Sequence, residues 1–311
     1  MIQDILPKKL DNAYKNRKPQ ENSRMLGFGD RTVYLKNEGE IEFLTYGKLK
    51  TYYETVLKKE VPESVYLFSI DKESNFGERN CQEDLSIEDS CQEDDNQEDY
   101  FLTDIPEEVQ IEGFAFHKMF DTRAMQPKES VLAAATAWHL YVWYRDNQFC
   151  GRCATKLVHS DKLRMMQCPE CGNMVFPKIA PAVIVGLTHG DEILMTKYAG
   201  REYKRYALIA GFTEIGETAE ETVAREVFEE VGLRVKNITY YKSQPWGFDS
   251  NLLMGFYCEL AEDEKIRLDR EELSMAEWVN YRDIPDYTEG LSLTHEMMAH
   301  FKEERSASIT K

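Results

Sequence analysis

The stretch that decides the fold runs from Gly211 to Leu233 and reads GFTEIGETAEETVAREVFEEVGL. It predicts a glycine-led turn followed by one short helix. The helix is expected to begin at Thr218, because Thr218 and Glu221 have the spacing of a capping box. It is expected to end at Gly232, since glycine tolerates the left-handed backbone of a helix C-terminus.

Three acidic residues share one side of this predicted helix. Glu226, Glu229 and Glu230 are three and four positions apart, so their side chains point in nearly the same direction. Like charges at this spacing repel, and a cation beside them removes the repulsion. Oxygen ligands favour Mg²⁺ or Mn²⁺. A solvated acidic face is the alternative interpretation of the same pattern.

Four cysteines form two CxxC pairs, Cys150-Gly-Arg-Cys153 and Cys168-Pro-Glu-Cys171, with 14 residues between them. This spacing predicts four thiolates around one tetrahedral Zn²⁺. Gly151 and Gly172 are expected to ease the tight turns. Because cysteine fills all four positions, no position stays open for water, and the zinc is expected to be structural. A thioredoxin-like redox role would need only one CxxC pair, so the second pair disfavours it.

Composition limits the partners of the chain. Its 311 residues are long enough for more than one core, and 42% of them are hydrophobic. A formal charge of -18 argues against DNA and against general nucleic-acid binding. The segment from Cys81 to Tyr100 holds nine acidic residues and no Lys or Arg, which predicts a flexible loop. Cys81 and Cys91 lack nearby His or Cys partners, which disfavours a second metal site there.

Localisation follows from the termini and the cysteines. The N-terminus has no apolar signal-peptide core, and no apolar run approaches the roughly 20 residues that span a bilayer. Seven cysteines, four of them in paired spacing, are typical of a reducing compartment. We therefore expect a cytoplasmic protein without membrane contact.

Three domains are expected. Residues 1–145 form a small α+β domain with the acidic loop at about 81–100, residues 146–176 form the zinc ribbon, and residues 177–311 form the third domain. Strands and helices alternate in the third, which predicts a mixed sheet between helices. The predicted strands of the first domain are Thr32–Leu35, Ile41–Tyr46 and Ser64–Ile70, and a helix follows from Pro127 or Lys128 to Asp146. Those of the third are Ala182–Leu187, Ile193–Thr196, Tyr206–Ala210, Arg234–Tyr241, Leu252–Leu260 and Ala276–Val279, followed by a helix over Leu293–Glu304.

The central stretch resembles the Nudix box, Gly-x5-Glu-x7-Arg-Glu-U-x-Glu-Glu-x-Gly-U, in which U is apolar. The matching positions are Gly211, Glu217, Arg225, Glu226, Val227, Glu229, Glu230, Gly232 and Leu233. The resemblance implies an α+β Nudix fold and metal-dependent hydrolysis of a nucleoside diphosphate linked to another moiety.

The resemblance also implies a set of metal ligands. Glu226, Glu230 and the carbonyl of Ala210 would bind the catalytic ion, and Glu229 would be a further ligand or would orient water. Glu272 would be a ligand from outside the box, with a solvated carboxylate as the alternative.

Two further residues of the box have implied supporting roles. Arg225 would pair with Glu229 or Glu221 and hold the carboxylates. Glu217 would be structural or an outer metal contact. Because the general base varies across the family, no residue is assigned to that role.

Three features resemble the NADH pyrophosphatases within this family: the four-cysteine ribbon, Phe176-Pro-Lys-Ile-Ala-Pro181 and Ser243-Gln-Pro-Trp-Gly-Phe-Asp-Ser. The resemblance runs from about Cys150 to Phe301. It implies a homodimer that cleaves NAD(H) to nicotinamide mononucleotide and AMP, and that also removes NAD caps from RNA.

The same resemblance implies the substrate contacts. Two aromatic residues, Phe176 and Phe212, would stack on the rings of the dinucleotide, and Thr294 would contact it from another element. A loop would line the pocket with Gln244, Pro245, Trp246, Gly247, Phe248, Asp249, Ser250 and Asn251. Core packing is the alternative for the aromatic pair in that loop. The signature has prolines where this chain has Gly247 and Asp249, so a less pre-organised loop is expected.

Two other functions are compatible with parts of the pattern. A Nudix hydrolase of ADP-ribose or of another nucleoside diphosphate would share the box. A non-catalytic regulator that binds NAD-like ligands would not need the complete set of Glu226, Glu229 and Glu230. A zinc-ribbon nucleic-acid binder is disfavoured by the charge.

Overall fold

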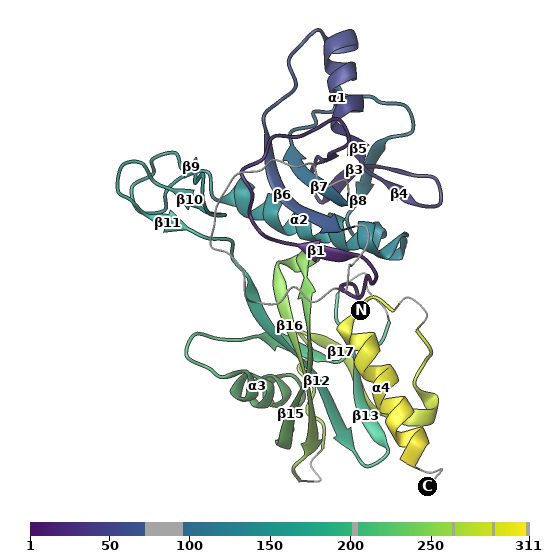
Figure 1. Ribbon diagram of the computed structural model, residues 1–311. Coiled ribbons are helices and arrows are strands. Elements are labelled where there is room, and N and C mark those ends of the chain that lie inside the picture. The colour runs from purple at the N-terminus through teal and green to yellow at the C-terminus, as the bar shows by residue number, and fades with distance from the viewer. Residues whose placement is uncertain (72–95, 201–204, 263–264, 288–289, 309–311) are drawn as a thin grey trace, which may run out of the picture. The chain divides into compact units, whose positions relative to one another are not determined.

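A computed structural model describes the chain except for residues 72–95, 201–204, 263–264, 288–289 and 309–311 (Figure 1). The chain divides into two compact units. One comprises Asp4–Pro177, and the other comprises Lys178–Lys311 together with Met1–Gln3. The first three residues therefore pack with the C-terminal unit, whereas the sequence placed them with residues 1–145.

In the part that precedes the zinc ribbon, the first unit contains two antiparallel-rich sheets and the long helix α2. Its five-stranded sheet has the order β1-β6-β7-β2-β5, and its three-stranded sheet has the order β4-β3-β8. The strands are β1 (Lys9–Asp11), β2 (Arg24–Leu26), β3 (Thr32–Asn37), β4 (Ile41–Glu42), β5 (Leu44–Thr45), β6 (Ser64–Asp71), β7 (Gln97–Thr103) and β8 (Ala115–Lys118). The helical elements are α1 (Tyr46–Tyr52), the π-helical turn η1 (Tyr53–Leu57), the 3-10 turn η2 (Asp121–Ala124) and α2 (Lys128–Asp146).

Two predictions for this unit need correction. The expected strand over 41–46 is interrupted at Phe43, and Thr45 instead caps α1 by accepting a hydrogen bond from the Lys48 amide. The end of the acidic segment is strand β7 and not a loop. There Glu98 pairs with Arg24 at 2.7 Å, and the adjacent hydrophobic side chains are buried. Cys81, Cys91 and the rest of the acidic loop through 95 lie outside the described residues.

The second unit is built around a six-stranded mixed sheet of order β15-β16-β12-β13-β17, with β14 paired to β12. The strands are β12 (Ala180–His189), β13 (Glu192–Tyr198), β14 (Ile209–Phe212), β15 (Val235–Trp246), β16 (Asn251–Leu260) and β17 (Leu273–Asn280). The helices are α3 (Ala219–Val231) and α4 (Leu293–Ser308), with 3-10 turns η3 (Gly247–Asp249) and η4 (Tyr281–Asp283). Only β12 and β16 run parallel among the described pairs of this sheet.

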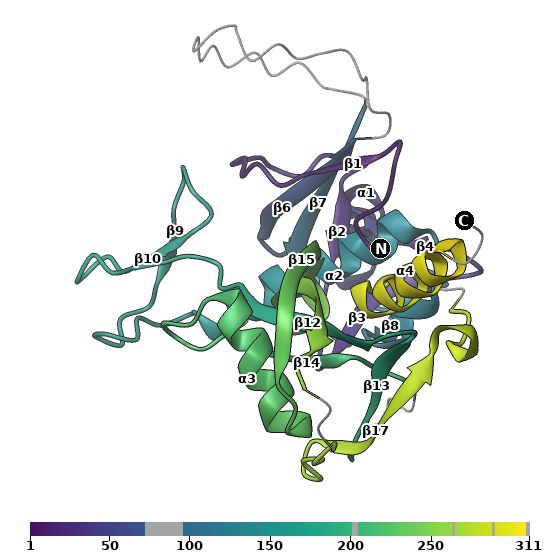
Figure 2. The ribbon, with the colours of Figure 1, turned by 90° about the horizontal axis from the view of Figure 1, so that it is seen from below.

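Alternation along β12 places the two helices on opposite faces of the sheet (Figure 2). Val183 and Val185 point into the core that α3 covers with its apolar face. Gly186, one position on, points to the other face, where a Cβ would lie 3.4 Å from Cε of Met297 in α4. The predicted mixed sheet between helices is therefore confirmed.

Among the residues that the structure describes, none of the helices is long and apolar enough to span a bilayer.

Candidate active site and zinc centre

The acidic helix α3 has the predicted ends. The Glu221 amide donates to the Thr218 hydroxyl at 3.2 Å, and the Thr218 amide donates to the Glu221 carboxylate at 2.8 Å. Gly232 ends the helix with φ of 69°, a conformation that favours glycine. Val223 and Val227 are fully buried and fix the helix on the sheet. This packing fixes the orientation of the helix, and with it the direction in which its acidic side chains point.

The three glutamates of the helix that are predicted metal ligands differ in exposure. Glu226 and Glu230 are 8% and 2% exposed, whereas the side chain of Glu229 is 57% exposed. Burial raises the pKa of Glu226, and the hydrogen bond from Arg225 opposes that rise. Burying two ionised carboxylates costs free energy unless cations lie beside them. The two buried acids and the exposed one together offer oxygen ligands to such a cation.

Glycine at position 211 allows Glu226 to approach the backbone of β14. A Cβ built on Gly211 would lie 1.9 Å from Cδ of Glu226, which no real contact allows. The carboxylate of Glu226 therefore lies directly against the backbone that follows Ala210. This is the close approach that the glycine at the start of the stretch makes possible.

Arg225 holds the acidic cluster from one side. Its Nε and Nη2 atoms donate to both oxygens of Glu217 at 2.7 and 3.0 Å, and Nη1 donates to Glu226 at 2.8 Å and to Glu229 at 2.9 Å. Nη2 also donates to the carbonyl of Phe212 at 2.8 Å. This fork ties the turn after β14 to α3.

The pairing of Arg225 was predicted only in part. Glu229 is a partner as expected, but Glu221 is not, because its carboxylate is used in the capping box. Glu217 takes that place and is the two-oxygen partner. The hydrogen bond from Arg225 lowers the pKa of Glu217 to about 2, so this carboxylate stays ionised at neutral pH.

Glu272 and Ala210 come from outside the helix. Glu272 is exposed, its carbonyl accepts from the Ala199 amide at 2.8 Å, and β17 begins one residue later. Its charge contributes to the raised pKa of Glu226, which places the two carboxylates within electrostatic reach. Ala210 lies in β14 opposite Ile184. All donors of this set are oxygens, so the residues present fit a hard divalent cation.

Substitution of Gly211 by alanine is expected to lower kcat by at least about 100-fold, because the new methyl group must displace Glu226 from its place. The fold should persist, since the clash involves one side chain next to solvent-accessible residues. Turnover and thermal unfolding of the variant measure the two effects. Gly151→Ala is the matched control, because no atom lies within 4 Å of a Cβ at Gly151 and its φ is not positive.

Half of the segment expected to be a substrate loop is strand. Ser243 to Trp246 continue β15 and pair with Asn251 to Met254 of β16. Pro245 is tolerated because β15 is an edge strand. The true turn consists of η3 and Ser250, which adopts a left-handed φ of 59°.

Gln244 lies in the interior. Its side chain is fully buried, its amide nitrogen donates to the Leu291 carbonyl at 2.8 Å, and its amide oxygen accepts from the Leu293 amide at 2.7 Å. Both ends of the amide are used inside the unit. Gln244 thus has no exposed atom to offer to a pocket wall.

The turn after β15 is held by an internal hydrogen bond, although it lacks the two prolines of the NADH pyrophosphatase signature. The indole Nε1 of Trp246 donates to the Asp249 carboxylate at 3.1 Å, and the Trp246 and Phe248 rings lie 5.0 Å apart between centroids. Trp246 is 8% exposed, which agrees with the core-packing alternative for this residue. Asp249 therefore orders the turn at a position where the signature has proline.

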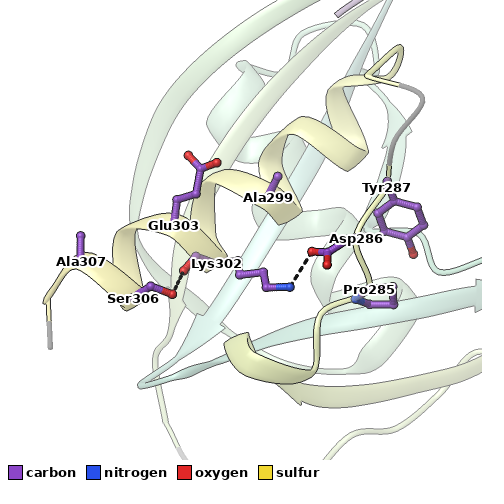
Figure 3. A pocket seen from close by; sticks show the side chains of 8 residues that line it. All are labelled: Pro285, Asp286, Tyr287, Ala299, Lys302, Glu303, Ser306 and Ala307. Carbon is purple, nitrogen blue, oxygen red and sulfur yellow. Dashed lines mark hydrogen bonds and ion pairs between the residues drawn. The ribbon is translucent and has the colours of Figure 1, made fainter. Parts of the chain in front are cut away.

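The remaining predicted contacts lie on separate elements. Phe212 is 55% exposed at the end of β14, Thr294 is in the first turn of α4, and Phe176, 54% exposed, belongs to the other unit. A cavity of about 590 Å³ beside the C-terminal half of α4 is lined by residues such as Asp286 and Lys302 and by none of these three (Figure 3).

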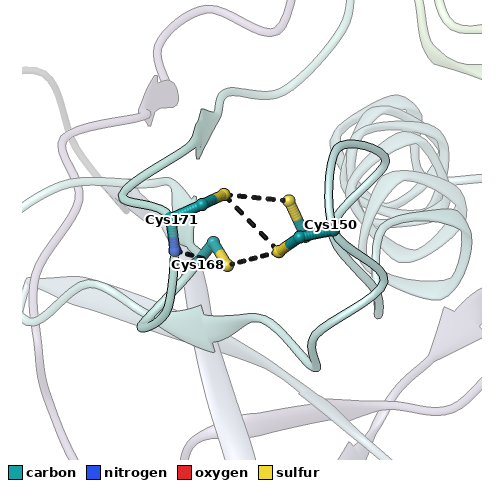
Figure 4. Close-up of side chains that lie close together, drawn as sticks. Cys150, Cys168 and Cys171 are labelled. Carbon is teal, nitrogen blue, oxygen red and sulfur yellow. Dashed lines mark hydrogen bonds between the residues drawn. The ribbon is translucent and has the colours of Figure 1, made fainter.

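Four thiols form the zinc centre. Figure 4 shows the side chains of Cys150, Cys168 and Cys171 turned toward one another, and all four Sγ atoms lie within 4.8 Å of each other. The closest Sγ pairs are 3.4 to 3.6 Å apart. Zinc–sulfur bonds of about 2.3 Å in a tetrahedron place the sulfurs about 3.8 Å apart, so the four thiols fit zinc.

The ribbon around the thiols has short strands and one small hydrophobic cluster, in which Leu157 and Met166 pack with Trp143 of α2. Its strands β9 (Val158–His159), β10 (Met166–Gln167) and β11 (Met174–Val175) have two residues each. Gly172 has a left-handed φ of 70°, whereas Gly151 does not have a positive φ. Ala154 adopts φ of 61° instead, because the left-handed residue follows the second cysteine of each knuckle. Gly151 lies in a turn, as predicted, but without the left-handed backbone that Gly172 has.

The comparisons with known proteins agree with this architecture. Residues 178–301 match the NUDIX domain, and residues 145–176 match the NADH pyrophosphatase zinc ribbon domain. A protein named NAD-capped RNA hydrolase NudC from Pseudomonas aeruginosa is 31% identical over 211 residues, which cover 68% of this chain and 76% of that one. The chain belongs to the Nudix hydrolases.

Further relatives share shorter regions with this Nudix hydrolase. A protein of the same name from Klebsiella pneumoniae is 41% identical over 143 residues, 46% of this chain and 55% of that one. A NUDIX hydrolase structure from Nitrosomonas europaea superposes with a TM-score of 0.44 at 24% identity over 51% of this chain and 93% of the other.

Proposed function

We propose that this Nudix hydrolase cleaves the pyrophosphate bond of NAD(H) to give nicotinamide mononucleotide and AMP, with Mg²⁺ or Mn²⁺ as cofactor. The observation that carries the proposal is the pair of buried carboxylates, Glu226 and Glu230, on a helix preceded in the chain by a four-cysteine ribbon. Relatives named NAD-capped RNA hydrolase support the choice of NAD(H) over other nucleoside diphosphates.

The proposed metal ligands are Glu226, Glu230, the Ala210 carbonyl, Glu229 and Glu272. A bound divalent ion would neutralise pyrophosphate charge and promote attack by water. Arg225 would keep the neighbouring carboxylates in place through its fork on Glu217. Among the proposed ligands on α3, the exposed Glu229 is the one best placed to meet a water molecule or the substrate.

For the substrate we propose contacts on several elements. Phe212 presents an exposed aromatic face that suits a flat base, and Phe176 presents another on its own unit. Phe248 and the backbone of the turn ordered by Asp249 would line the pocket with Thr294. The structure favours a supporting role for Gln244, whose amide is occupied internally.

NAD-capped RNA is a second proposed substrate, and the names of the relatives are the observation that favours it. The net charge of -18 gives an RNA chain little general attraction. We therefore expect decapping that depends weakly on salt and proceeds at a rate comparable to that on free NADH. If the protein releases no cap nucleotide from NAD-capped RNA, the proposal that it acts on this second substrate is wrong.

Assembly and compartment are proposed from the family resemblance and the cysteines. We infer a homodimer, which light scattering of the purified protein would detect at twice the 36.3 kDa of one chain. We infer the cytoplasm as the site of action, because zinc thiolates persist in a reducing compartment.

A panel of dinucleotides distinguishes the proposed function from its nearest alternative. NADH, NAD⁺ and ADP-ribose would be compared by kcat/KM in Mg²⁺ or Mn²⁺, with phosphatase-coupled phosphate release from the nucleotide products. We expect kcat/KM for NAD(H) to exceed that for ADP-ribose. The reverse order would assign the site to ADP-ribose, and binding of all three without turnover would indicate a regulator.

A further inference from the structure

A buried amide connects two elements that we propose to lie at the substrate. Gln244 is two residues before Trp246, which begins the ordered turn after β15. Its amide bonds reach 47 and 49 residues along the chain, to Leu291 and Leu293, where α4 begins. One side chain therefore fixes the distance between the Trp246 turn and the first turn of α4.

The N-terminal residues support this amide. The Ile2 amide donates to the same Leu291 carbonyl at 2.9 Å, and Ile2 is 1% exposed. The Gln3 amide nitrogen donates to the Ser243 carbonyl at 3.1 Å, and the Gln3 amide oxygen accepts from Gln244 at 3.4 Å. These three residues, Met1–Gln3, pack with the C-terminal unit although they begin the chain.

The start of α4 has little freedom to shift. A Cβ at Gly255 of β16 would lie 2.8 Å from the Met297 sulfur and 3.3 Å from Cδ2 of Leu293, so the helix rests on the strand backbone. Tyr257 adds a hydrogen bond of 2.6 Å to the Met297 carbonyl. Packing thus fixes the height of α4 above the sheet, while the amide fixes the position of its first residue along the strands.

We propose that Gln244, backed by Met1–Gln3, is a positioning clamp that holds Thr294 of α4 in register with the Trp246 turn and thereby sets the affinity for the dinucleotide. The clamp rests on the proposed function for its effect on substrate, because Thr294 and the turn are proposed contacts. The clamp makes no contact with the acidic cluster of α3 among the hydrogen bonds described. Its loss should therefore act on binding more than on the chemical step.

Gln244→Met tests the clamp, because methionine keeps the length of the side chain and removes both hydrogen bonds. We expect KM for NADH to rise at least about tenfold while kcat changes less than about threefold. Gln3→Ala removes only the supporting bonds and should raise KM by about threefold. Gln20→Met, at an exposed position, is the matched control and should leave both constants unchanged.

Hydrogen exchange separates the clamp from the proposed function. The Leu293 amide should exchange faster in Gln244→Met and in Gln3→Ala than in the natural chain, whatever the substrate. Unchanged exchange in both variants would refute the clamp, as would an unchanged KM or a fall in kcat alone. If Gln244→Met does not fold, Gln3→Ala decides by the same criteria. A natural chain that cleaves no dinucleotide would refute the proposed function, while the exchange experiment would still decide the clamp.

Discussion

Replacement of Glu230 by glutamine is expected to lower kcat for dinucleotide hydrolysis by about 10³-fold or more, equivalent to about 4 kcal/mol of transition-state stabilisation. Glu230 is 2% exposed and lies one turn after Glu226 on α3. Glutamine has the same shape but no charge, so it would weaken any divalent cation held by this pair. Single-turnover rates at saturating metal would measure the loss.

The design needs a control for the charge of the helix. Glu220→Gln removes one charge from an exposed position at the start of the same helix and should retain the natural kcat. Circular dichroism should show both variants folded. A Glu230→Gln enzyme with natural activity would contradict the assignment of this carboxylate to the catalytic ion.

Loss of zinc is expected to have the largest effect on stability. Cys168→Ala removes a buried thiol from the cluster, and the zinc content should fall from one per chain to nearly none. Structural zinc supplies about 10–16 kcal/mol in small zinc-binding peptides, and strands of two residues cannot replace that contribution. Residues 145–176 should then lose their protection from hydrogen exchange.

Metal analysis and exchange mass spectrometry would follow this change. Cys258→Ala is the matched control, because Cys258 is equally buried but lies in the core of the C-terminal unit. It should retain one zinc per chain and lose only a modest part of the free energy of unfolding. A Cys168→Ala protein with full zinc content would contradict the four-thiolate centre.

The sequence predicts those features that depend on neighbouring residues. The capping box of Thr218 and Glu221 and the left-handed Gly232 both depend on spacing within one helix, and both are confirmed. The CxxC pairs likewise bring four thiols together as predicted. Local steric and hydrogen-bonding rules suffice for such features.

Features that depend on distant residues were not predictable. The partners of Gln244 are 47 and 49 residues away, so no local pattern distinguishes a clamp from a pocket residue. The predicted partners of Arg225 lay one helical turn away on α3. Glu217, which also binds it, lies before the helix, in the segment that follows β14. The hydrogen bond from Trp246 to Asp249 spans three residues and could have been predicted from the sequence, because an acid at that spacing can accept from an indole.

The central claim is that the chain hydrolyses the pyrophosphate bond of NAD(H). The most direct measurement is product analysis by liquid chromatography and mass spectrometry after incubation of NADH with the protein and Mg²⁺ or Mn²⁺ in ¹⁸O-labelled water. We predict reduced nicotinamide mononucleotide and AMP in equal amounts, with one ¹⁸O atom on a phosphate, and product formation by Glu230→Gln slower by about 10³-fold or more. Release of nicotinamide with ADP-ribose, or intact NADH under all metal conditions, would contradict it.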